Sequence, residues 1–165
     1  EENRLAKARE LLAKAKASLT ARKYHVAIED YTKAIAFDPN SATAYVQRGF
    51  AKSTLGDDRG AIEDSTKAIE LDPSLVNAYV NRGFAKRTLG DFQGAIEDST
   101  KAIELDPALV SPYVNRGFAK RAQGDLQRAA LDIEQALRLD PEHRYAEAMR
   151  DFLSKHLDRE PNPGK

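Results

Sequence analysis

Apolar positions recur along this chain at the three- and four-residue spacing of amphipathic helices, in paired runs separated by a short break. In the clearest case the first run extends from Tyr79 to Thr88, stops at Gly90-Asp91, and is followed by a second run from Ala95 to Ile103. Glycine suits the left-handed backbone that ends many helices, and an aspartate beside it can accept the free amide hydrogens at the next helix start. The pattern predicts two helices, each about a dozen residues long, joined by a tight turn.

The same helical hairpin recurs at a fixed interval. Successive Asp-Pro pairs lie 34 residues apart, at Asp38-Pro39, Asp72-Pro73, Asp106-Pro107 and Asp140-Pro141. Proline cannot continue a helix, so each pair marks the end of a unit. Segments 44–73 and 78–107 align without gaps and differ at only four places, Gln47/Asn81, Ser53/Arg87, Asp58/Phe92 and Arg59/Gln93. We therefore predict an array of stacked hairpins, which presents an extended binding surface.

Charged residues also recur with the units. Arginines in the first helix and aspartates in the second helix stand at matching distances from the turn, as Arg48, Arg82, Arg116 and Asp64, Asp98, Asp132. We expect ion pairs within or between units, with a structural role, because a partly buried charge is costly once its partner is lost. We interpret the lysine column of Lys52, Lys86 and Lys120 as a solvated face. Small residues such as Gly83 and Ala95 are interpreted as sites of close helix packing.

Five positions recur together in three units, as Tyr45, Gly49, Ala61, Ala68 and Pro73, as Tyr79, Gly83, Ala95, Ala102 and Pro107, and as Tyr113, Gly117, Ala129, Ala136 and Pro141. This set resembles the signature of the tetratricopeptide repeat (TPR) family. The resemblance implies an all-α fold, a right-handed superhelical solenoid of antiparallel helix pairs. It covers four repeats, at about 8–41, 42–75, 76–109 and 110–143. The first repeat departs from the pattern at Leu11 and Ala15, where the family prefers an aromatic residue and glycine.

Residues 144–157 are similar to the extra helix that usually closes such arrays. Tyr145, Met149, Phe152 and Leu153 give this segment an apolar stripe. We expect residues 1–157 to form a single TPR domain and residues 158–165 to form a disordered tail.

The resemblance implies that the first helix of each repeat lines a concave groove. On this basis the groove residues are Val46, Gln47, Phe50, Asn77, Val80, Asn81, Phe84, Arg87, Val114, Asn115, Phe118 and Arg121. The phenylalanine column is the sharpest feature, and it has two interpretations. The rings could contact an apolar peptide segment, or they could fill core space left by Ser65 and Ser99. A second column contains Gln47, Asn81 and Asn115, whose amides could grip a peptide backbone or could be solvated or form local hydrogen bonds.

Composition narrows the classes of function. Lys plus Arg and Asp plus Glu both number 26, so no overall charge attracts nucleic acid, and we expect no nucleic-acid partner. The chain has no cysteine, and its 3 histidines, His25, His143 and His156, lie in different units without metal-ligand spacing. It also lacks a phosphate-binding glycine loop and a nucleophile motif. We therefore expect no catalytic activity, no cofactor and no metal ion.

The chain also lacks a membrane-spanning pattern. No apolar run approaches the roughly 20 residues that cross a bilayer, so we expect a soluble protein without membrane insertion, in the cytoplasm or the periplasm. Because the first residue is Glu1 and not Met, we expect that an upstream segment has been removed.

The sequence predicts a non-catalytic protein–protein interaction scaffold that binds a peptide or partner-protein segment in its groove. The clamp of lysines, asparagines and an arginine by which some TPR domains bind acidic chaperone tails is mostly absent. Asn81 fits one clamp column, but Leu12, Phe50 and Asn77 occupy or neighbour the others. Two alternatives stay open. The chain could be a self-assembling module that forms a homo-oligomer end to end or groove to helix, or an engineered or recently duplicated array without an evolved partner.

Overall fold

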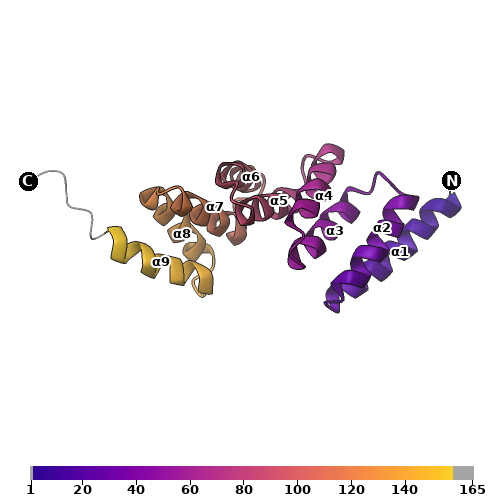
Figure 1. The fold of residues 1–165 in the computed structure, drawn as a ribbon, viewed down its shortest axis with the longest axis horizontal. Helices are drawn as coiled ribbons and strands as arrows, with labels where there is room; N and C mark the ends of the chain where they lie inside the picture. The colour runs from indigo at the N-terminus through magenta and orange to yellow at the C-terminus, as the bar shows by residue number, and fades with distance from the viewer. Residues whose placement is uncertain (1, 158–165) are drawn as a thin grey trace, which may run out of the picture.

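A computed structural model describes residues 2–157, which fold into nine α-helices joined by short connections (Figure 1). The helices are α1 (Glu2–Thr20), α2 (Tyr24–Phe37), α3 (Ala42–Thr54), α4 (Asp58–Leu71), α5 (Val76–Thr88), α6 (Phe92–Leu105), α7 (Val110–Ala122), α8 (Leu126–Leu139) and α9 (Arg144–Leu157). This architecture confirms the predicted all-α array of helix pairs. The tail predicted at 158–165 lies outside the described residues.

The helix pairs follow one another along the long axis of the molecule (Figure 1). The first helices of successive units contact each other, so that α3 meets α5 and α5 meets α7. Among the described helices, the second helices α4, α6 and α8 make no such contacts with one another. The array therefore curves with α3, α5 and α7 on its inner wall.

The turn within each unit has the predicted geometry. Gly56, Gly90 and Gly124 each adopt a φ of 85°, which a residue with a Cβ rarely adopts. The aspartates that follow them cap the next helix, because each side chain accepts a hydrogen bond from the backbone amide three residues on, as Asp91 does from Gly94. The first unit lacks this signal, and Arg22 takes the left-handed conformation there with a φ of 58°.

Small residues bring the two helices of a unit close together, as predicted. Ala95 is fully buried, and a Cβ added at Gly83 would lie 3.2 Å from the Asp98 Cβ and 3.4 Å from the Ala95 carbonyl oxygen. A larger residue at Gly83 would therefore force α5 away from α6.

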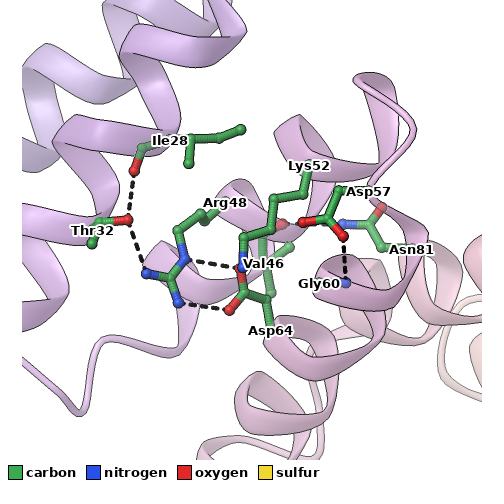
Figure 2. A network of polar contacts seen from close by, with 9 residues as sticks. All are labelled: Ile28, Thr32, Val46, Arg48, Lys52, Asp57, Gly60, Asp64 and Asn81. Atoms are coloured by element: carbon green, nitrogen blue, oxygen red, sulfur yellow. Dashed lines mark hydrogen bonds and ion pairs between the residues drawn. The ribbon is translucent and has the colours of Figure 1, made fainter.

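In three units an arginine of the first helix forms a two-pronged ion pair with an aspartate of the second helix. Figure 2 shows the first of these pairs, Arg48 with Asp64. Arg48 Nε donates to Asp64 Oδ2 at 2.8 Å and Nη2 donates to Oδ1 at 2.7 Å. The remaining terminal nitrogen, Nη1, donates to Thr32 Oγ1 at 3.0 Å, in the preceding unit. Arg82 and Arg116 repeat this arrangement with Asp98 and Thr66 and with Asp132 and Thr100. Each arginine thus ties its own hairpin together and joins it to the hairpin before it.

The lysine column joins the same network, so its interpretation as a solvated face was wrong. Lys86 Nζ lies 2.9 Å from Asp98 Oδ2, and its side chain is only 21% exposed. Lys52 and Lys120 approach Asp64 and Asp132 in the same way. The physical reason is helix geometry, because each lysine lies four residues after the arginine and therefore on the same face of the helix.

The first unit carries a weaker version of the network. Asp30 stands where the later units have Asp64, and it is buried, but Lys14 Nζ lies 3.5 Å from Asp30 Oδ1 and Lys33 Nζ lies 3.9 Å from it. Within the described residues, Asp30 Oδ2 has no hydrogen-bond partner. Ser18 occupies the position of the second cation, Lys52. A single flexible ammonium cannot make the paired hydrogen bonds of a guanidinium.

The last helix continues the 34-residue register of the inner wall. In α9, Met149, Phe152 and Leu153 stand 34 residues after Asn115, Phe118 and Ala119 of α7. Met149 and Leu153 are buried against the preceding pair, but Tyr145 is 72% exposed and does not belong to the apolar stripe predicted for it. Asp151 stands where α7 has Gly117, the residue that allows a second helix to approach.

We predict that Arg82→Leu lowers the free energy of unfolding by about 2 kcal/mol, because it leaves a buried carboxylate with one cation. Chemical denaturation followed by circular dichroism measures this. As a control, Lys101→Leu removes one partner of the exposed Lys101–Glu104 pair and should cost at most about 0.5 kcal/mol. Equal stability of Arg82→Leu and the wild type would show that the network does not hold the units together.

We predict that the double substitution Lys14→Arg and Ser18→Lys stabilises the protein by about 1 kcal/mol, because it gives Asp30 the guanidinium and the close ammonium that Asp64 has. The readout is the denaturation midpoint. The control is Lys14→Arg with Ser18→Gln. It supplies the guanidinium at position 14 without a positive charge at position 18, and it should recover only part of the gain in stability.

Candidate functional site

Two adjoining hollows lie along the inner wall formed by α3, α5 and α7. The first hollow, of about 420 Å³, is lined by Phe50, Ser53, Thr54, Val80, Asn81, Phe84 and Ser111. The second hollow, of about 440 Å³, is lined by Phe84, Arg87, Ser111, Val114, Asn115, Phe118, His143 and Tyr145. Phe84 and Ser111 line both hollows, so the two form one continuous stretch of surface.

Phe50 and Phe84 of the phenylalanine column lie at this surface, whereas Phe118 lines the second hollow and also packs against the core of the last units. Phe50 and Phe84 are each 45% exposed, and Phe118 is partly buried. The space beside the second-helix serines is filled in other ways. Ser65 lies against Gly49, and Ser99 accepts a hydrogen bond from the side chain of Asn115. Phe50 and Phe84 therefore do not fill the space beside these serines.

The amide column divides into residues with different surroundings. Asn115 is only 8% exposed, its Nδ2 donates to Ser99 Oγ at 2.9 Å, and its Oδ1 accepts from Arg87 Nε at 2.6 Å. Asn81 Nδ2 donates to the Val46 carbonyl oxygen at 3.2 Å (Figure 2). Within the described residues no hydrogen bond reaches Asn81 Oδ1, which leaves an acceptor at the first hollow. The Asn115 amide is thus bonded at both ends within the protein, whereas the Asn81 amide keeps one acceptor that a ligand can use.

The difference between the two asparagines follows from one residue in the preceding unit. Arg87 reaches forward to Asn115, but the equivalent position before Asn81 holds Ser53, which is too short to do so. Ser53 Oγ instead donates to Asp58 Oδ1 at 2.7 Å. The Ser53/Arg87 difference between the middle repeats therefore leaves the first hollow without a charged lining residue and gives the second hollow a guanidinium.

Arg87 is held among apolar groups. Its Cζ lies 5.1 Å from the ring centroid of Phe84 and 5.4 Å from that of Phe118, both within cation–π range. Burial lowers the pKa of the Arg87 guanidinium from its ordinary value, and the charge of Asp58 acts in the opposite direction. The group stays charged at neutral pH, because arginine titrates far above it. The second hollow therefore carries a positive charge with two aromatic neighbours.

Other predicted groove residues lie beside the hollows or away from them. Gln47 and Asn77 line a shallower depression with Val46 and Phe50. Val46 itself is 5% exposed and packs in the core between the second and third units. Arg121 lines neither hollow. Its Cζ lies 3.9 Å from the Phe152 ring centroid, so α9 covers the place that Arg87 leaves open one unit earlier.

Sequence reasoning missed three lining residues, Ser53, His143 and Tyr145. The last two could have been found from the repeat, because His143 and Tyr145 stand 34 residues after Leu109 and Ser111. The 34-residue register of the inner wall continues past the fourth unit, so the start of α9 and the residue before it form one rim of the second hollow.

Residues 2–157 contain no group of three or more His, Cys, Asp or Glu side chains placed to hold a metal ion. No described helix combines the length and apolar character needed to cross a membrane.

Comparison with known proteins places these features in a family. Family models described as tetratricopeptide repeat match residues 42–75, 76–109 and 110–143. No curated protein matches the sequence.

Solved structures give the same picture. The Arabidopsis OM64 TPR domain is 31% identical, with a TM-score of 0.69 over 70% of this chain and 96% of that one. The first TPR domain of Spaghetti (RPAP3), solved with the HSP90 peptide SRMEEVD, is 28% identical, with a TM-score of 0.70 over 73% of this chain and 96% of that one. MamA from Desulfovibrio magneticus RS-1 has a TM-score of 0.84 at 20% identity, over 92% of this chain and 86% of that one, and shares the fold. The chain belongs to the tetratricopeptide repeat family.

Proposed function

We propose that the protein is a non-catalytic scaffold that binds a peptide or an extended segment of a partner protein along the two hollows. The observation that carries this proposal is Phe84, a large apolar side chain that is 45% exposed and lines both hollows. Contact with a partner would remove this ring and that of Phe50 from water. Such burial contributes about 25 cal/mol for each Å² of apolar surface.

Polar groups at the same surface suit a peptide backbone. Asn81 has an acceptor without a partner among the described residues, and Ser53, Thr54 and Ser111 line the first hollow beside it. Side-chain amides and hydroxyls can bond to backbone groups of any sequence, whereas the apolar rings select side chains. An extended segment that alternates between the two kinds of contact would fit this wall.

The wall is also held in place before any partner arrives. The arginine–aspartate pairs of α3, α5 and α7 fix these helices to their own partners and to the preceding units. A preorganised surface loses less conformational entropy on binding. The RPAP3 domain solved with a peptide gives a related example in which the ligand is a short segment.

The experiment is selection of binders from a random-peptide display library on the wild type, with the selected peptides tested against Phe84→Asp. Peptides that bind the wild type and not the folded variant would support the groove. Peptides that bind the wild type and the variant equally well would place the peptide-binding site outside the groove. If no peptide is selected and the mass measured by sedimentation rises with concentration, the protein is a self-assembling module instead.

We predict that Phe84→Ala weakens a selected peptide at least about tenfold, because the ring is an anchor shared by both hollows. The free energy of unfolding should fall by no more than about 1.5 kcal/mol, since the ring is nearly half exposed. Fluorescence polarisation and urea denaturation measure the two quantities. The comparison variant Ile133→Ala, at a core residue that is 1% exposed, should instead lose about 2 to 5 kcal/mol of stability.

We predict that Ser53→Arg weakens peptide binding about tenfold, because the new side chain would bond to Asn81 as Arg87 bonds to Asn115 and would fill the first hollow. The control is Ser53→Ala, which removes the Ser53–Asp58 hydrogen bond but leaves the hollow open. Equal affinity of the arginine variant and the wild type would show that the first hollow takes no part in binding.

A further inference from the structure

Arg87 differs in its bonding from Arg48, Arg82 and Arg116, the arginines of the ion-paired network. Arg48, Arg82 and Arg116 each donate two hydrogen bonds to one aspartate of their own unit. Arg87 donates from Nε to the neutral amide of Asn115 and forms no ion pair with any described carboxylate. Asp58 acts on Arg87 as a nearby charge but forms no ion pair with it. The guanidinium is therefore partly removed from water without a hydrogen-bonded anion, which is unfavourable.

The geometry leaves one edge of the Arg87 guanidinium unused. Nε is bound to Asn115 Oδ1 at 2.6 Å, which fixes the orientation of the group, and the rings of Phe84 and Phe118 lie beside it. Within the described residues, Nη1 and Nη2 have no hydrogen-bond partner. Arg87 lines the second hollow, so a ligand there meets a fixed pair of donors between apolar walls.

We propose that the second hollow receives a carboxylate of the bound peptide on Arg87, and that an apolar group next to this carboxylate packs against Phe84, Val114 and Phe118. The inference rests on the proposed function and adds the chemistry of the ligand. A carboxylate matches the two donors of a guanidinium, and charge-assisted bonds of this kind are about twice as strong as neutral ones. The source of the carboxylate is either an Asp or Glu side chain or the free C-terminus of the peptide.

The composition of the hollow favours a single carboxylate over a more highly charged group. Among its lining residues, Arg87 is the one permanent cation, and the remaining residues are aromatic, aliphatic, hydroxyl and amide groups with one histidine, His143. A phosphoryl group would bring nearly two negative charges and three acceptor oxygens, of which one arginine could satisfy only a part. The neighbouring first hollow has no cation, because Ser53 replaces the arginine there, so the carboxylate is expected at one end of the bound segment.

The test compares peptide selection on the wild type, Arg87→Gln and Lys101→Gln. Lys101→Gln is the matched control, because it removes one positive charge from an exposed pair on α6. The wild type and the control should select peptides with an Asp, a Glu or a free C-terminal carboxylate beside an apolar residue. The Arg87→Gln variant should select apolar peptides without this acidic preference.

A second experiment measures the interaction between Arg87 and the carboxylate directly, with one peptide selected by the wild type. Replacing its acidic residue by the corresponding amide, or amidating its C-terminus, should weaken binding to the wild type about 10- to 100-fold and identifies the source of the carboxylate. The same change should have little effect on binding to Arg87→Gln, since the interaction is already lost. Should Arg87→Gln fail to fold, the peptide changes still test the proposal on the wild type.

The outcomes separate this inference from the proposed function. Peptides that depend on Phe84 but show no preference for a carboxylate would overturn the inference and leave the scaffold function intact. If the wild type selects no peptide, or if the selected peptides bind Phe84→Ala as well as the wild type, the groove proposal fails and the inference fails with it.

Discussion

The arginine–aspartate pair that spans each hairpin is the interaction on which the arrangement of the units depends. In three units one guanidinium uses all three of its nitrogen positions, two on the aspartate of its own second helix and one on a threonine of the preceding unit. The nearby lysine adds a second cation to the same carboxylate. Apolar packing alone fixes distances between helices, but these directional bonds also fix the rotation of each unit relative to the one before it.

Most of the fold could be predicted from the sequence because its signals are local. Gly90 and Asp91 specify a turn and a helix cap through their own backbone and side-chain properties, and the 34-residue interval repeats that information. The contact of Lys86 with Asp98 was not predicted, because it depends on how far a side chain can bend toward another helix. The burial of Asn115 was missed for a similar reason, since it depends on Arg87 in the preceding unit.

Near-identical repeats do not imply identical surfaces. The two middle units differ at four positions, yet the substitution of Arg87 for Ser53 changes the charge of the adjoining hollow and the bonding of the next asparagine. The change acts across the boundary between units, so a repeat viewed alone does not reveal it. The chemistry of such a wall belongs to pairs of neighbouring repeats, which share one hollow between them.

The lack of contact among α4, α6 and α8 has a mechanical consequence. Each second helix packs against the first helix of the next unit and not against the next second helix. A change in the curvature of the array is therefore opposed along the inner wall and at the α4–α5 and α6–α7 contacts, but not by direct contact along the outer edge. The molecule is therefore held more directly along its inner side than along its outer edge. A ligand bridging α3, α5 and α7 would fix the curvature of this wall, so its binding would set the distance between the first and the last units of the array.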